Sequence, residues 1–138
     1  MMEMNDKQKE KVNGKFNSFK NGNFSENDQD TVLNHSDEIL EKANEGALQK
    51  FADDIKTMCS MVKAWSHKAY TEAPKKTIGM IIITLVYVFS PIDIISDLLP
   101  GIGLVDDASI VSLCIAAARA DINDFRRWAR SNNPKLLK

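Results

Sequence analysis

Four aspartates lie within fifteen residues of one another in the second half of the chain: Asp93, Asp97, Asp106 and Asp107. Asp93 and Asp97 are four residues apart, so they share one face if their segment is helical. Carboxylate oxygens are preferred ligands of Mg²⁺ and Ca²⁺, and two carboxyl groups can act together as general acid and base. The segment lacks the spacing of an EF-hand, which counts against calcium.

The same aspartates also have a structural interpretation, which we favour. Asp93 stands in the first turn of a predicted helix, where an acid stabilises the positive end of the helix dipole. Asp106 or Asp107 is suited to cap the next helix. Asp97 is expected to pair with an arginine, because a buried carboxylate without a partner costs several kcal/mol. The candidate partners are Arg119, Arg126 and Arg127.

No other group of residues has the spacing of a catalytic or metal site. Cys59 and Cys114 lie in apolar helical stretches and are expected to be core thiols. His35 and His67 lack the spacing of a zinc site. The chain has no phosphate-binding glycine loop, no dinucleotide pattern and no nucleophile elbow. We therefore predict no enzyme, no small-molecule substrate and no cofactor, with Mg²⁺ or Mn²⁺ at the aspartates as the alternative.

Composition is that of one globular domain. The 138 residues are 43% hydrophobic and 27% charged, and the net charge of −1 gives no argument for nucleic acid as a partner. The N-terminus has no apolar run typical of a secretion signal, so we expect a cytoplasmic protein whose thiols stay reduced. Charge is uneven: residues 77–118 contain no basic residue, whereas residues 119–138 contain six basic and two acidic ones.

Two helices are predicted in the first half of the chain. Ser25 and Asp28 have the form of a capping box, which predicts a helix over residues 26–43. A stripe of apolar residues spaced three and four apart predicts a second helix over residues 47–71, ended by Pro74. Its members are Leu48, Phe51, Ile55, Met58, Val62, Trp65 and Ala69. The stripe fits either packing inside one bundle, which we favour, or self-association.

The second half is predicted to form a buried helix followed by a helix–turn–helix. Residues 77–89 carry no charge and are too few for a membrane span, which needs about 20 residues. A short helix over 91–98, a turn over 99–103 and a last helix that begins at Asp106 or Asp107 follow. Asn132, Asn133 and Pro134 are predicted to close the fold. The prediction is an all-α bundle of four to five helices with a central buried helix. It spans residues 25–133, between tails at 1–24 and 134–138.

The segment 87–107 resembles the YkvA family of bacterial proteins. The matching residues are Tyr87, Ser90, Pro91, Asp93, Asp97, Pro100, Gly103, Asp106 and Asp107. Ser96 departs from the family pattern, which usually has proline there and so lacks the backbone N–H that serine restores. The similarity extends over about residues 58–128. It implies a domain of unknown function without established catalytic residues, in a family whose members are often predicted to be membrane-associated.

Three functions are consistent with these observations. We favour a non-enzymatic helical interaction or scaffold module, with an unknown protein partner or a second copy bound through residues 47–71. The first alternative is a membrane-associated protein that inserts residues 77–118 as a hairpin, although the aspartates near the hairpin tip oppose deep insertion. The second alternative is a carboxylate site for Mg²⁺ or Mn²⁺.

Overall fold

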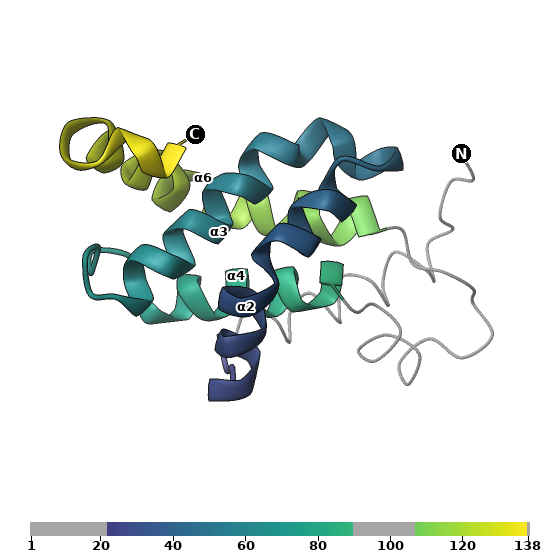
Figure 1. Ribbon diagram of the computed structural model, residues 1–138, viewed down its shortest axis with the longest axis horizontal. Helices are drawn as coiled ribbons and strands as arrows, with labels where there is room; N and C mark the ends of the chain where they lie inside the picture. The colour runs from purple at the N-terminus through teal and green to yellow at the C-terminus, as the bar shows by residue number, and fades with distance from the viewer. Residues whose placement is uncertain (1–21, 90–106, 138) are drawn as a thin grey trace.

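The described part of the chain is all-helical and contains no strand, as predicted. The computed structural model describes residues 22–89 and 107–137. Within these two ranges, four α-helices form the bundle in Figure 1: α2 (Glu26–Ala43), α3 (Ala52–Ser66), α4 (Lys75–Phe89) and α6 (Asp107–Asn132). Two short 3₁₀ helices accompany them, η1 (Gly46–Phe51) before α3 and η2 (Pro134–Leu137) after α6.

The first helix has the predicted bounds and the predicted cap. The backbone N–H of Asp28 donates to Ser25 Oγ at 3.0 Å, and the N–H of Ser25 donates to Asp28 Oδ2 at 3.0 Å. These two bonds satisfy donors that the first turn of a helix leaves without partners. The face that α2 turns to the bundle carries Val32, Ile39 and Ala43, which are all buried.

The second helix is shorter than predicted at both ends. The chain forms η1 up to Phe51, whose φ of −106° and ψ of 7° separate it from α3. At the other end, the N–H groups of Ala69 and Tyr70 both donate to the Ala64 carbonyl, and Lys68 adopts a left-handed φ of 61°. The helix therefore ends at Ser66, well before Pro74.

The apolar stripe predicted for that segment is buried in its middle but not at its C-terminal end. Ile55, Met58 and Val62 are buried inside the bundle, whereas Ala69 is exposed because it lies beyond the end of α3. The buried part of the stripe packs against helices of the same chain, since α3 contacts α2, α4 and α6. Packing within one bundle is thus the interpretation that the structure supports for this stripe.

The apolar segment 77–89 forms the central helix of the bundle. Helix α4 contacts α2, α3 and α6, and nine of its fifteen residues are buried. Its first part also meets the chain just before α2: a Cβ at Gly79 would lie 2.0 Å from the Gly22 carbonyl oxygen. Glycine is therefore required at position 79 for this close approach.

Helix α6 begins at Asp107, one of the two predicted starts, and ends at Asn132. Phe125 packs edge-on against Tyr70 and stacks on Trp128, with ring centroids 5.1 and 5.8 Å apart. Both expected tails are partly packed on the bundle. Phe24 lies against Trp65, and η2 replaces most of the expected C-terminal tail, with its leucines against the core.

Candidate functional site

Most of the motif that resembles YkvA proteins lies outside the described residues. Tyr87 is buried in α4, and Asp107 is the first residue of α6. The remaining positions lie outside, namely Ser90, Pro91, Asp93, Asp97, Pro100, Gly103 and Asp106, together with the predicted short helix. The four-carboxylate site therefore stays a prediction. Within residues 22–89 and 107–137, no three His, Cys, Asp or Glu side chains are placed to hold a metal ion.

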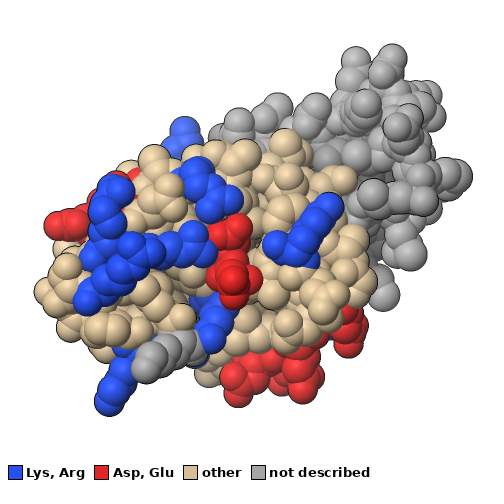
Figure 2. All heavy atoms as spheres, turned by 90° about the horizontal axis from the view of Figure 1, so that it is seen from above, with Lys and Arg blue, Asp and Glu red and all other residues tan. Residues whose placement is uncertain are grey.

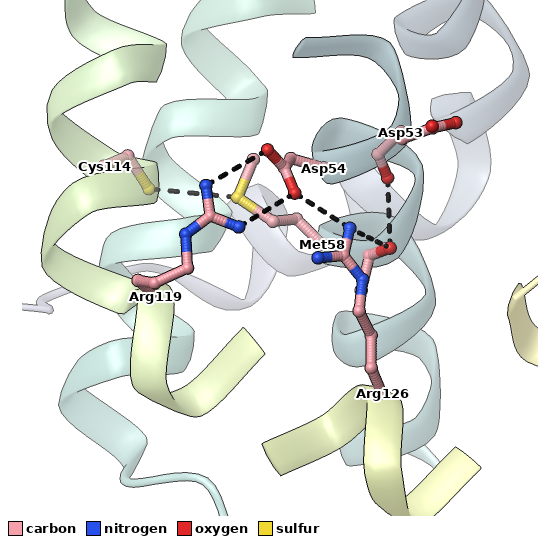
Figure 3. Close-up of polar contacts among 7 residues, drawn as sticks. Asp53, Asp54, Met58, Cys114, Arg119 and Arg126 are labelled. Carbon is pink, nitrogen blue, oxygen red and sulfur yellow. Dashed lines mark hydrogen bonds and ion pairs between the residues drawn. The ribbon is translucent and has the colours of Figure 1, made fainter. Parts of the chain in front are cut away.

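Two of the three candidate arginines converge on one carboxylate, that of Asp54 in α3 (Figure 3). Arg119 donates to Asp54 Oδ1 and Oδ2 at 3.2 and 3.3 Å, and Arg126 donates to Oδ1 at 2.8 Å. The arginines are seven residues apart, so both point from the same face of α6 toward α3. This cluster ties the two helices together on the outside of the bundle.

A threonine extends the cluster along α3. Arg126 also donates to Thr57 Oγ1 at 3.1 Å, and Thr57 in turn donates to the Asp53 carbonyl at 3.0 Å. Burial by itself would raise the pKa of Asp54, but the hydrogen bonds and charges of Arg119 and Arg126 outweigh it and hold the pKa below its usual value. Asp54 is therefore an ionised structural carboxylate at neutral pH.

Arg127 does not join this cluster. It pairs with Asp124 three residues earlier on the exposed side of α6, a surface pair of small energetic value. Pairing of Arg119, Arg126 or Arg127 with Asp97 stays a prediction, because Asp97 lies outside the described residues. The sequence analysis missed Asp54. The sequence held an indirect signal: two arginines two turns apart on one helix indicate an acid on a neighbouring helix, but not which acid.

A groove opens beside the cluster, on the face formed by η1, α3, α6 and η2. Its volume is about 560 Å³. Figure 2 shows this side of the molecule, where basic side chains surround a small acidic group. We call it the basic groove and define it by its lining residues: Lys50, Asp53, Asp54, Lys56, Thr57, Arg126, Arg130 and Leu137.

The basic groove is equipped for electrostatic binding rather than for nucleophilic chemistry. Its lining contains no cysteine or histidine. Both thiols of the chain lie in the core, as predicted, where burial raises the pKa of Cys59 and of Cys114 to about 12. A thiol with such a pKa is almost entirely protonated at neutral pH and is a poor nucleophile.

The central segment of the chain is similar in sequence to a known family of proteins. Residues 77–113 match the family model described as "Protein of unknown function (DUF1232)". The chain is 27% identical over 90 residues to "Uncharacterized membrane protein YkvA" of Bacillus subtilis (strain 168), an alignment that covers 65% of this chain and 82% of that protein. These two similarities support a YkvA-family domain of unknown function in this chain. No solved structure matches it.

The segment matched by the DUF1232 model and the basic groove lie in different parts of the sequence. The family match covers α4 and the beginning of α6, whereas every residue that lines the groove lies outside residues 77–113. The groove is thus built by the parts of this chain that surround the matched segment. Among the described helices, none has both the length and the apolar character needed to cross a membrane.

Proposed function

We propose that this chain is a non-enzymatic helical module that binds at a membrane surface while its apolar helix stays inside the bundle. The observation that carries the proposal is the position of α4, which is enclosed by α2, α3 and α6. Membrane attachment is supported by the relative from Bacillus subtilis, which is described as a membrane protein. In this arrangement α4 has a structural role, and the surface of the bundle makes the contacts.

The competing function is insertion of residues 77–118 into the bilayer as a hairpin. That function requires α4 to leave the bundle, because residues such as Ile81, Ile82 and Leu85 are fully buried by protein. Opening the bundle would expose the faces of α2 and α3 that now cover α4. Lipid would then have to replace these contacts on α4, while the uncovered apolar faces of the other helices would remain in water.

Fractionation of the untagged protein separates the two functions. A surface-bound module sediments with the membranes and is released from the pellet by high salt, because salt screens contacts between exposed charges. An inserted hairpin stays in the pellet after the salt wash and is released by detergent alone. Release by detergent alone would overturn our proposal.

Two substitutions on α4 sharpen this test. Val86 is half-buried and Val88 is buried, so Val86→Lys should be tolerated by the bundle, whereas Val88→Lys should lower its melting temperature strongly. In an inserted hairpin both lysines would face a similar penalty of about 2.5–3.5 kcal/mol in lipid. Equal loss of both variants from the membrane fraction, with the wild type held there through a salt wash, would support the hairpin.

A further inference from the structure

The basic groove carries an excess of positive charge that the rest of the chain does not share. Its lining provides four cations, Lys50, Lys56, Arg126 and Arg130, beside the two carboxylates of Asp53 and Asp54. The whole chain has a net charge of −1, so this excess is local. Because a cleft whose lining is net positive raises the local concentration of anions, the ligand class that fits the groove is an anion.

Part of the charge in the groove is already compensated. Asp54 pairs with both Arg119 and Arg126, so its single negative charge offsets one of their two positive charges. Within residues 22–89 and 107–137, no ion pair or hydrogen bond engages the ammonium of Lys56 or the guanidinium of Arg130. These two cations come from different helices, α3 and α6, and line the same groove. An anion bound there would bridge the two helices.

The lining also restricts what kind of anion can bind. Four cations beside two carboxylates leave few charges to neutralise an extended polyanion such as RNA, whose binding depends on the number of phosphates neutralised. The volume of about 560 Å³ lies within the range of about 300–1,000 Å³ found for small-ligand sites. A phosphate monoester carries about −1.5 to −2 charges at pH 7 and three acceptor oxygens. It therefore matches the donors of an ammonium and a guanidinium group.

From this geometry we propose that the basic groove binds a phosphate monoester, with Lys56 and Arg130 as its principal ligands. The group belongs either to a soluble phosphorylated small molecule or to the headgroup of a membrane lipid. The proposal stands independently of membrane attachment, because a soluble phosphate would bind to the same two side chains.

Titration calorimetry with inorganic phosphate and with phenyl phosphate tests the site directly. The double substitution Lys56→Gln and Arg130→Gln should weaken binding about tenfold, because it removes charge-assisted hydrogen bonds in a groove open to solvent. Asp53→Asn should strengthen binding severalfold, because it removes a like charge from the lining. The control variant Lys75→Gln with Lys76→Gln changes the net charge equally on exposed positions of α4 and should leave the affinity unchanged.

Flotation with vesicles distinguishes the two sources of the phosphate. The probes are phosphatidylcholine vesicles with and without phosphatidic acid, whose headgroup is a phosphate monoester. Binding of soluble phosphate alone assigns the site to a small molecule, and binding of both assigns it to a lipid headgroup. Both results support the groove as a phosphate site, and the first of them would at the same time count against attachment through this groove.

The proposal is wrong if neither probe binds saturably. It is also wrong if the groove variant and the Lys75/Lys76 control weaken binding equally, because binding would then follow net charge alone. Neither Lys56 nor Arg130 makes a hydrogen bond within the described structure, so the double variant should keep the wild-type melting temperature. If the melting temperature of the double variant falls, the affinity of the single variant Arg130→Gln is measured instead, because Arg130 is exposed.

Discussion

Replacing Asp54 with asparagine should loosen the contact between α3 and α6 without changing the shape of either helix. The carboxylate accepts three hydrogen bonds from two arginines, at 2.8, 3.2 and 3.3 Å. Asparagine keeps one acceptor oxygen but has no charge, and its amide hydrogens point at guanidinium groups that are also donors. Arg119 would then lose its hydrogen bonds to α3, and Arg126 would keep only the one to Thr57.

The expected loss of stability depends on how exposed each charged side chain is to solvent. The side chain of Arg119 is 46% exposed, so its pair with Asp54 contributes about 0–1 kcal/mol. Arg126 and Asp54 are only 22% and 18% exposed, and a charge-assisted hydrogen bond in such a position contributes about 1.5–3 kcal/mol. We therefore expect a loss of about 2 kcal/mol, which corresponds to a melting temperature about 8 °C lower for a domain of this size.

The effect should depend on pH in a defined direction. Because the pKa of Asp54 is lowered in the folded state from the usual 3.8, its stabilisation is present above the unfolded-state pKa and is lost as the pH falls through the folded-state pKa. The difference in melting temperature between the wild type and Asp54→Asn should thus be complete at neutral pH. It should shrink once the pH falls below about 4.

Thermal denaturation followed by circular dichroism measures these differences. The control is Asp53→Asn, because Asp53 is the neighbouring residue, is exposed and makes no side-chain ion pair in the described structure. That variant should stay within about 0.5 kcal/mol of the wild type. Equal shifts for both variants, or a shift for Asp54→Asn that persists unchanged at acid pH, would refute the assignment of stability to the arginine pairs.

Three further predictions concern the core and the metal alternative. Gly79→Ala should lower stability by about 1–3 kcal/mol in a thermal melt, because its Cβ would collide with the Gly22 carbonyl; an unchanged melt would show that this approach is unimportant. Cys59 and Cys114 should not react with a thiol reagent at mildly alkaline pH until denaturant is added, since both pKa values lie at about 12. Mg²⁺ or Mn²⁺ should leave the melting temperature unchanged; a rise that is abolished by Asp93→Asn would favour a carboxylate metal site.

The fold was predictable from the sequence wherever a local signal and the apolar pattern agreed. The bounds of α2 follow from its capping box, and the start of α6 follows from an aspartate before an apolar stripe. The end of α3 was not predictable in this way, because the stripe continues to Ala69 while the helix stops at Ser66. Proline was the expected end signal, but hydrogen bonds to the Ala64 carbonyl end the helix earlier.

The candidate site was predictable only in part, because its residues come together from distant segments. The basic end of the chain was visible in the sequence, but Arg119 and Arg126 were predicted as partners of Asp97, whereas the structure pairs them with Asp54. Asp54 was not visible in this way, because a single acid in the first turn of a helix is common and gives no indication of its partner 65 or 72 residues away. The groove adds Lys50 and Lys56, whose proximity to Arg130 depends on how α3 packs against α6.

The central position of α4 has a consequence for the order in which the chain is made. Two of the helices that cover α4, namely α2 and α3, precede it in the sequence, and the Lys42 ammonium at the end of α2 donates to the Phe89 carbonyl at the end of α4. As the chain leaves the ribosome, two of the helices that pack on α4 are therefore already synthesised when α4 emerges. The face that packs on α6 is the last to be covered, so the interval before α6 is made is when a chaperone, or a bilayer, has access to α4.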